Sequence, residues 1–292
     1  MTKSAGKTGA GPTVTVAIEQ HFPAPQRVLD DSLAYKMLPL GMRTVVWMTK
    51  PAFMRDWFVR SLEKPAPGIW AGVLVRKRYI DEKLLESVDH IRAVVNLGAG
   101  LDTRLYRMAE LASLPAWEVD QPENIAAKRA GLESALGEVP RHITLVPIDF
   151  DNEALSDALA RHGYVAGAVT FFILEAVTQY LTEAGIESVF GFLSTAAPGS
   201  RLAFTYVTKD FMDGTDTHGQ DQLRAKYVTK EKIWLWGMDP DAVAGFLARY
   251  GWRLVEHPTY AELAQRYIAP TGRNLASTPI ERIVYAEKLA GT

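Results

Sequence analysis

Cysteine is absent from this sequence of 292 residues. The absence excludes disulfide bonds, thiol nucleophiles and thiolate metal sites. Long apolar runs are missing too, because Lys50 and Pro51 interrupt the most apolar early stretch and no run reaches the ~18 residues of a membrane-spanning helix. Residues 1–12 lack the apolar segment of a signal peptide. We therefore expect a soluble, cytoplasmic protein with no membrane partner.

A charge excess of either sign is also missing, since the formal net charge is only −2. So small a charge gives no electrostatic reason to expect nucleic acid or an anionic membrane as a partner. The six histidines have no metal-ligand spacing, and they are His21, His90, His142, His162, His218 and His257. The sequence thus predicts no metal site and leaves a small molecule as the expected partner, with the oligomeric state open.

What is present is a change of pattern along the chain. Residues 1–12 are rich in Gly, Lys and Thr, which predicts a disordered tail, and residues 13–90 have apolar residues at helical spacing, which predicts an N-terminal helical cap. From residue 91 to residue 292, strand-like runs alternate with helical patterns. Within this α/β domain, residues 208–237 predict a lid-like insertion with glycines and mixed charge.

The alternation predicts a doubly wound, mostly parallel sheet with helices on both faces, a Rossmann-like architecture. In such sheets ligands bind beyond the carboxyl ends of the strands. The expected strands are 91–97, 116–120, 143–146, 168–174, 200–207, 252–256 and 282–286, and the expected helices are 103–112, one from Pro122, 182–196 and 239–250.

A glycine-rich turn, NLGAGLDTR, follows the first expected strand. Gly98 and Gly100 let the backbone pass close to a ligand, as in many nucleotide-binding proteins. The third glycine of the dinucleotide fingerprint is replaced by Thr103, and Asp102 would repel a pyrophosphate at the helix N-terminus. A cofactor without phosphates, S-adenosylmethionine, fits this turn better, although Asp102 could equally be a helix N-cap.

Acidic residues end the neighbouring expected strands. Asp120 follows the glycines by about 20 residues, the position that binds ribose hydroxyls, unless it simply begins the next helix. Asp149 and Phe150 follow the third strand and could contact an adenine, or could belong to an ordinary loop. Glu175 ends an apolar strand, and we expect it to face the amino group of the cofactor.

Together these motifs resemble the leucine carboxyl methyltransferase family, in particular its bacterial branch of small-molecule O-methyltransferases. The resemblance rests on VRKRYID, NLGAGLDTR, EVDQPENIAAK, IDF and LEAVTQYLT, which begin at Val75, Asn96, Glu118, Ile148 and Leu174. It implies a class I methyltransferase that depends on S-adenosyl-L-methionine. One departure is Ala176, which stands where the family usually has glycine and could reshape the floor of the pocket.

The resemblance also implies roles for individual residues. The cofactor-binding set is Arg76, Gly98, Ala99, Gly100, Asp102, Asp120, Gln121, Asp149, Phe150 and Glu175. Arg76 would pair with the cofactor carboxylate, although Arg78 lies close enough in the sequence to exchange roles with it. Tyr180 would lie near the transferred methyl group. His218, in the insertion, is the histidine to test as a general base.

Methyl transfer from a sulfonium requires neither a covalent nucleophile nor a metal, but it requires an oriented acceptor and exclusion of water. A carboxylate acceptor is already ionised at neutral pH, whereas a phenol benefits from a base. Because no base is evident, the sequence favours a carboxylate acceptor, in a small molecule of secondary metabolism. Two alternatives stay open at this point: a catalytically silent cofactor-binding regulator, and a nicotinamide-dependent oxidoreductase.

Overall fold

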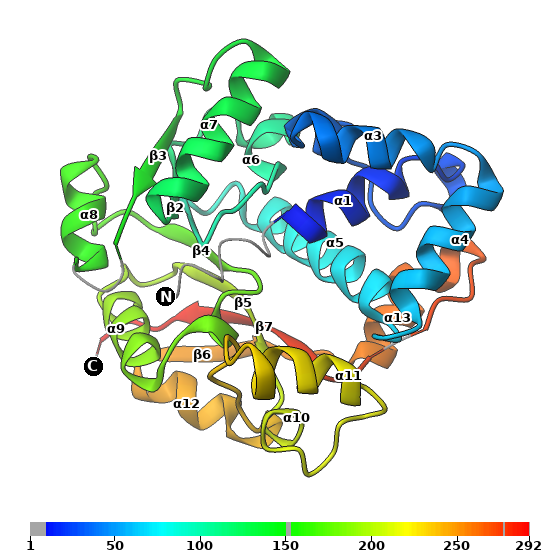
Figure 1. Cartoon of the computed structure of the whole chain (residues 1–292). Coiled ribbons are helices and arrows are strands. Elements are labelled where there is room, and N and C mark those ends of the chain that lie inside the picture. The colour runs from blue at the N-terminus through cyan, green and yellow to red at the C-terminus, as the bar shows by residue number, and fades with distance from the viewer. Residues whose placement is uncertain (1–9, 150–152, 277, 292) are drawn as a thin grey trace.

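The computed structural model describes residues 10–149, 153–276 and 278–291. Its centre is a seven-stranded sheet with strand order β3-β2-β1-β4-β5-β7-β6 (Figure 1). The strands are β1 Ala93–Leu97, β2 Ala116–Asp120, β3 Ile143–Pro147, β4 Thr170–Leu174, β5 Arg201–Val207, β6 Trp252–Glu256 and β7 Glu281–Lys288. Strands β1 to β5 are parallel, and β7 runs antiparallel between β5 and β6. The predicted doubly wound, mostly parallel sheet is confirmed.

Helices cover both faces of this sheet. They are α1 Ala10–Glu19, α2 Ala34–Met37, α3 Leu40–Met48, α4 Ala52–Glu63, α5 Ile69–Ser87, α6 Arg104–Arg107, α7 Pro122–Leu136, α8 Leu155–Arg161, α9 Glu183–Ser194, α10 Lys209–Asp213, α11 Asp221–Arg224, α12 Val243–Arg249 and α13 Tyr260–Tyr267. Within the described residues, no helix combines the length and the apolar character needed to cross a membrane.

Alternate residues of the central strands point into two separate cores. Val94 and Phe171 pack with α1, α2, α5 and α13, whereas Val95 and Phe172 pack with α8, α9 and α12. Successive side chains of a strand face opposite sides of the sheet, so a strand covered on both faces is apolar throughout. Strands β1 and β4 are accordingly buried at every position, and they are apolar except at Asn96 and Thr170.

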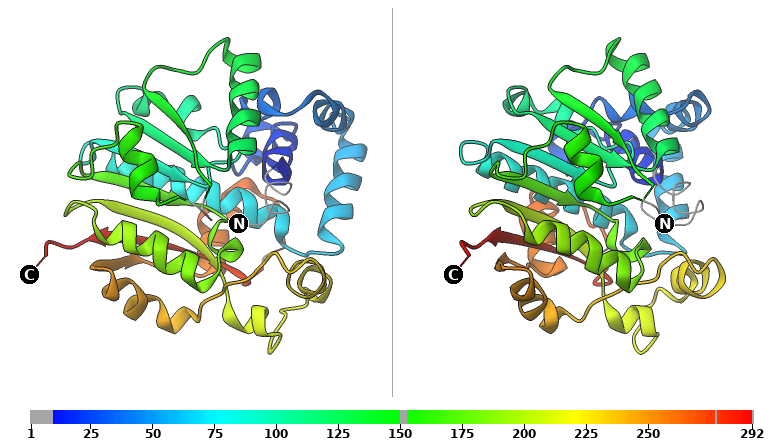
Figure 2. Two further views of the ribbon diagram at one scale, coloured as in Figure 1. Left: turned by 60° about the vertical axis from the view of Figure 1, so that its left-hand side comes forward. Right: turned by 90° about the vertical axis from the view of Figure 1, so that its left-hand side faces the viewer.

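The N-terminal helices share their core with the sheet. Helix α5 packs against β4, β5 and β7, and its Trp70 and Tyr79 are fully buried. In Figure 2 the dark and light blue helices stand beside one end of the sheet, and the cyan α5 crosses it. Residues 10–12 were predicted to belong to a disordered tail, but they form the first turn of α1. Pro12 fits there because the N–H groups of the first turn have no partner within the helix, so the N–H that proline lacks is not missed.

Two predicted helices are shorter than the sequence suggested. The helix expected over 103–112 ends after α6, because Met108 leaves the helical region (φ −97°, ψ 105°), and a 3-10 turn follows. The helix expected over 239–250 begins with a 3-10 turn at Pro240, and only α12 is α-helical. Residues 208–237 contain α10, α11 and a π-helical turn, Ala225–Lys230.

The turn after β1 depends on Gly98. Its φ is +72°, a left-handed conformation that favours glycine, and its amide donates to Val119 O at 2.8 Å. A Cβ placed on Gly98 would lie 2.3 Å from Cγ2 of Val177. The Val177 side chain, from the turn after β4, therefore packs directly against the backbone after β1.

We expect Gly98→Ala to lower the free energy of unfolding by about 2–4 kcal/mol, through backbone strain and the clash with Val177. Gly137→Ala is the matched control, because Gly137 also has a positive φ (+89°) but no atom within 4 Å of an added Cβ. The control should lose only about 1–2 kcal/mol, and Val177→Ala should partly rescue Gly98→Ala. If urea unfolding showed the same loss of unfolding free energy for both glycine variants, the close contact between Gly98 and Val177 would be contradicted.

Candidate functional site

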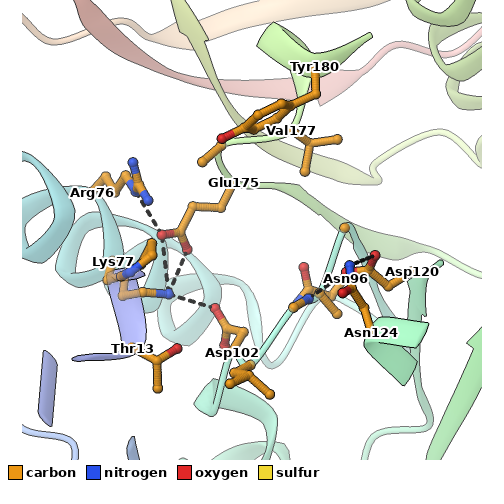
Figure 3. A pocket seen from close by; sticks show the side chains of 16 residues that line it. Thr13, Arg76, Lys77, Asn96, Asp102, Asp120, Asn124, Glu175, Val177 and Tyr180 are labelled. Carbon is orange, nitrogen blue, oxygen red and sulfur yellow. Dashed lines mark hydrogen bonds and ion pairs between the residues drawn. The ribbon is translucent and has the colours of Figure 1, made fainter. Parts of the chain in front are cut away.

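A polar cavity lies at the carboxyl ends of β1, β2 and β4 (Figure 3). Strands β2 and β4 flank β1 on opposite sides, and the chain order reverses between β1 and β4. This reversal is the switch point at which doubly wound sheets bind their ligands. The cavity measures about 110 Å³ and is bordered by the glycine turn, by α5 and by the first turn of α1.

Asp120, the last residue of β2, is held against the glycine turn. Its Oδ2 accepts a hydrogen bond from the Gly100 amide at 2.7 Å. Its Oδ1 accepts from the Gln121 amide and from Asn124 Nδ2, both at 2.7 Å. Only 3% of Asp120 is exposed. The carboxylate is thus fixed at the cavity wall by donors from the turn and from α7.

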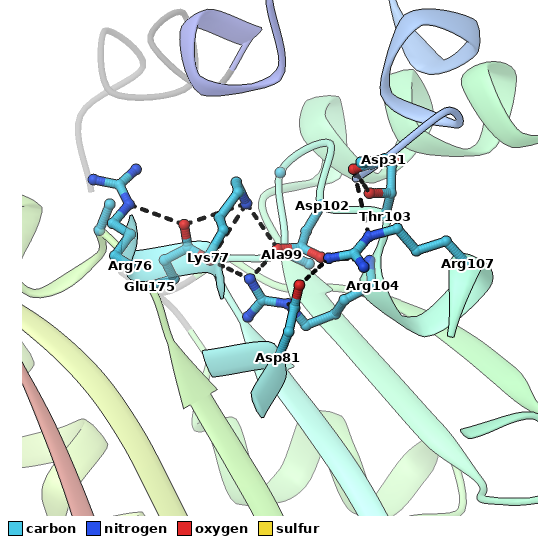
Figure 4. A network of polar contacts seen from close by, with 12 residues as sticks. Asp31, Arg76, Lys77, Asp81, Ala99, Asp102, Thr103, Arg104, Arg107 and Glu175 are labelled. Atoms are coloured by element: carbon cyan, nitrogen blue, oxygen red, sulfur yellow. Dashed lines mark hydrogen bonds and ion pairs between the residues drawn. The ribbon is translucent and has the colours of Figure 1, made fainter. Parts of the chain in front are cut away.

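Glu175, the residue after β4, lies at the centre of a buried ionic network, which we define as Glu175 with Arg76, Lys77, Asp102 and Arg104 (Figure 4). Its carboxylate accepts from Arg76 Nε at 2.9 Å and lies 3.2 Å from Lys77 Nζ. Lys77 also reaches Asp102 at 3.0 Å. The network ties α5 to the turns that follow β1 and β4.

Arg104, from α6, joins the remaining charges. Its side chain is 1% exposed, and its guanidinium contacts Glu175 Oε2 at 2.5 Å and Asp102 Oδ2 at 3.0 Å. Asp81 lies 3.3 Å from Arg104 Nε and also binds Arg107. Asp102 is not the N-cap of α6 that the sequence allowed, because Thr103 occupies that position. Asp102 Oδ1 nevertheless accepts a hydrogen bond from the Arg104 amide at the start of α6.

The network keeps its carboxylates ionised. Burial by itself raises the pKa of Glu175, but the nearby Lys77, Arg104 and Arg76 outweigh it and lower the pKa to about 2. Burial likewise opposes ionisation of Asp102, and Arg104 and Lys77 hold its pKa below the ordinary range. Both carboxylates are therefore ionised at any physiological pH, and each is paired with cations of the network.

The structure brings eight of the predicted site residues to this cavity: Arg76, Gly98, Ala99, Gly100, Asp102, Asp120, Glu175 and Tyr180. Gln121 is not among the lining residues, because its backbone begins α7 just beyond Asp120. Asp149 also lies outside the lining, on an exposed segment after β3. Phe150 lies outside the described residues. The binding roles of all these residues remain predictions.

Arg78 cannot take the cofactor-binding role predicted for Arg76, because the two side chains point in different directions from α5. Two positions along an α-helix rotate a side chain by about 200°, so Arg78 is exposed while Arg76 lines the cavity. The second cation at the cavity is Lys77, which sequence reasoning missed. Asn96 and Asn124 were missed as well, although Asn124 stands one helical turn after Asp120.

His218 is not placed where a general base for this site would be. It lines neither this cavity nor the larger one described next. Its Nε2 lies 2.9 Å from Asp210 and its Nδ1 lies 3.3 Å from Asp216. The chain turns sharply after α10, with His218 at φ +50°, and directs the imidazole to these acids. The three side chains could together ligate a metal, a grouping that the histidine spacing did not predict.

A second cavity, which we call the apolar cavity, adjoins the first. It measures about 430 Å³ and lies between α1, α3, α4, α5 and the chain of residues 207–234. The two cavities share Pro12, Arg76, Ala176 and Tyr180 in their walls. A ligand in one cavity could therefore meet a ligand in the other beside Tyr180 and Ala176.

Ala176 adopts a left-handed backbone at this boundary, with φ +56°. Its amide donates to Thr205 Oγ1 at 2.8 Å, which holds the turn after β4 in place. A left-handed conformation costs a residue with a Cβ about 1–2 kcal/mol, but costs glycine little. The alanine that departs from the family pattern is thus strained.

We expect Ala176→Gly to raise the free energy of unfolding by about 1 kcal/mol, because relief of strain outweighs the greater freedom of glycine in the unfolded chain. Ala184→Gly, inside α9, is the control and should lose about 1 kcal/mol. Urea unfolding measures both. A loss of stability in Ala176→Gly similar to that in the control would refute strain at this turn.

Glu175→Gln should lower the free energy of unfolding by about 3 kcal/mol at pH 7, because it leaves three buried cations with one carboxylate fewer to neutralise them. Because the folded pKa of Glu175 is about 2 against an ordinary 4.5, its contribution is complete above pH 4.5 and is lost as the pH falls toward 2. Urea unfolding across this range should show the variant and the wild type converging. Glu110→Gln, at an exposed position, is the control, and a gap that stays constant with pH would argue against the network.

Comparison with known proteins supports the resemblance seen in the motifs. The model of the leucine carboxyl methyltransferase family matches residues 10–194. A candidate S-adenosyl-L-methionine-dependent methyltransferase of Bacillus subtilis, YktD, is 31% identical over 60% of this chain, and the match spans 57% of that protein. A similarly named protein of Mycobacteroides abscessus is 28% identical over 89% of this chain and 87% of its own length.

A solved structure gives the same fold. The crystal structure of a candidate methyltransferase from Thermobifida fusca has a TM-score of 0.57 and 16% identity, and it covers 81% of this chain and 89% of its own. The match to the family model takes in α5, the glycine turn, Asp120 and Glu175. The chain belongs to the leucine carboxyl methyltransferase family.

Proposed function

We propose that this protein transfers a methyl group from S-adenosyl-L-methionine to an oxygen atom of a small molecule, in secondary metabolism. Family membership and the named relatives make the chain an S-adenosylmethionine-dependent methyltransferase. The observation that carries the proposal is the pairing of two cavities, one polar at the switch point of the sheet and one apolar beside it.

The residues of the polar cavity fit this cofactor by their chemistry. Asp120 can accept hydrogen bonds from ribose hydroxyls, and Gly100 leaves open space where a Cβ would stand. The buried Asn96 Nδ2 has no hydrogen-bond partner among the described residues, so a donor is available to a ligand. Carboxylates of Glu175 and Asp102 suit an ammonium group, and Arg76 suits a carboxylate.

Binding must also open this cavity. Small-molecule sites usually measure about 300–1,000 Å³, and this one measures about 110 Å³. The Lys77 ammonium lies between Asp102 and Glu175, where we expect the ammonium of the cofactor to bind. Movement of this long, flexible side chain would free both carboxylates and enlarge the cavity.

S-adenosyl-L-methionine supplies, when bound, a methyl group on a positively charged sulfur, which an oxygen can attack directly. The protein must then orient the acceptor and exclude water. Tyr180 and Ala176 lie at the boundary of the two cavities, so they are the residues expected beside the reacting atoms. The apolar wall beyond them keeps water from the acceptor.

The test is calorimetric titration of the full chain with S-adenosylmethionine, S-adenosylhomocysteine and NAD. We expect the first two to bind and NAD not to bind. Asp120→Ala should weaken binding roughly 100-fold, the equivalent of two hydrogen bonds to a charged group. Asp89→Ala removes an exposed carboxylate outside the cavity and should leave binding unchanged.

Thermal melting of both variants checks that they are folded. Binding of NAD in place of the sulfur compounds would overturn the proposal. Cofactor binding without methylation of any acceptor by the wild type would instead favour a silent, cofactor-binding regulator.

A further inference from the structure

The apolar cavity has walls that suit a flat, apolar ligand. Trp70, Tyr227 and Trp234 line it together with aliphatic side chains from α3, α4 and α5. Tyr227 and Trp234 stack at 5.1 Å between ring centroids, with 18° between their planes. Aromatic side chains of this kind make stacked and edge contacts with ring systems. The cavity is large enough, at about 430 Å³, for a small polycyclic molecule.

Two buried amide oxygens in the wall lack hydrogen-bond donors among the described residues: Oε1 of Gln179 and Oε1 of Gln220. These residues are 4% and 2% exposed. The orientation of Gln220 is fixed, because its Nε2 donates to Pro67 O and to Thr278 Oγ1, both at 2.6 Å. Buried polar atoms are normally paired, so these oxygens indicate a ligand that carries donors.

The charges of the wall are already paired with one another. Among the described lining residues, Arg76 and Glu281 are the charged ones, and they lie 2.6 Å apart. Arg76 is paired with Glu175 as well, at 2.9 Å. Glu281 Oε1 has no hydrogen-bond partner among the described residues, which adds a third acceptor to the two amides, against one unpartnered donor, Trp234 Nε1. A carboxylate acceptor would therefore meet an excess of acceptor oxygens. Among the described lining residues its one cation would be Arg76, which is already paired with two glutamates and which we assign to the carboxylate of the cofactor.

We propose that the acceptor is a neutral aromatic molecule that carries one or more hydroxyl groups. The inference rests on the proposed function and names its substrate class. The ring system fills the apolar cavity, and its hydroxyl groups donate to Gln179, Gln220 and Glu281. On transfer, the reacting oxygen bonds to the methyl carbon and the carbon–sulfur bond breaks with its electron pair remaining on sulfur, which leaves S-adenosylhomocysteine. The hydroxyl proton passes to the Glu281 carboxylate or to water. This acceptor class replaces the carboxylate that the sequence alone favoured, because the wall offers acceptors to a hydroxyl and no free charge to a carboxylate.

Three probes of one shape separate these chemistries: 2-naphthol, 2-naphthoate and 2-methoxynaphthalene. Calorimetric titration with the full chain, in the presence of S-adenosylhomocysteine, measures each affinity. We expect 2-naphthol to bind roughly tenfold more tightly than either of the others, because it alone supplies a donor. Equal or tighter binding of 2-naphthoate would overturn the inference, and equal binding of 2-methoxynaphthalene would do the same.

Two variants test which side chain of the wall accepts the hydrogen bond from the hydroxyl group. The single hydroxyl of 2-naphthol donates one hydrogen bond. Gln179 precedes Tyr180 at the boundary of the two cavities, where the reacting hydroxyl must lie, so Gln179→Leu should remove most of the preference for 2-naphthol over 2-methoxynaphthalene. Gln222→Leu, at an exposed position, should keep it. Gln220 also binds Pro67 and Thr278, so it is left intact in this test. A preference that survives in a folded Gln179→Leu variant would overturn the assignment of this wall.

These titrations distinguish a wrong substrate class from a wrong function. If S-adenosylhomocysteine does not bind, the proposed function falls and the substrate class falls with it. If S-adenosylhomocysteine binds but 2-naphthoate is preferred, only the substrate class is wrong.

Discussion

A guanidinium with 1% of its side chain exposed lies beside the proposed cofactor site, and the geometry of that site depends on it. Arg104 cannot be buried without partners, because an unpaired interior charge costs several kcal/mol. Glu175 and Asp102 supply the partners, and each comes from a different turn at the carboxyl edge of the sheet. The pairing therefore fixes the turn after β4 against the turn after β1, and it holds α5 to both through Arg76 and Lys77.

This pairing explains how one edge of the sheet can be both stable and ready to bind a cation. The network contains two carboxylates and three cations, but Lys77 is long and flexible and reaches both acids from their open side. Arg104 is rigidly enclosed and stays. A ligand ammonium could thus take the place of Lys77 without new charge being buried.

The apolar cavity, where we propose that the acceptor binds, is formed in a different way. Its wall comes from segments far apart in the chain: α1, the helices of residues 40–76, the turn at 176–180, the segment 207–234 and residues 278–281. None of these segments carries a motif for a substrate, and the chemistry of the wall appears only when they meet. A family can keep its cofactor site and change its substrate in this way, since the two sites share only the residues at their boundary.

The sequence by itself determined the sheet, the glycine turn and the acids that end β2 and β4. These features are local: apolar strands buried on both faces, a positive φ that favours glycine, and strand ends that parallel pairing brings to one edge. It could not determine that Lys77 rather than Arg78 reaches the site, because that depends on how α5 is rotated against the sheet. It also misplaced His218, which tertiary contacts direct to Asp210 and Asp216. Only the tertiary structure decided the partners of Glu175 and the unpaired oxygens of Gln179 and Gln220, because long-range packing, not local spacing, determines which buried polar atoms find partners.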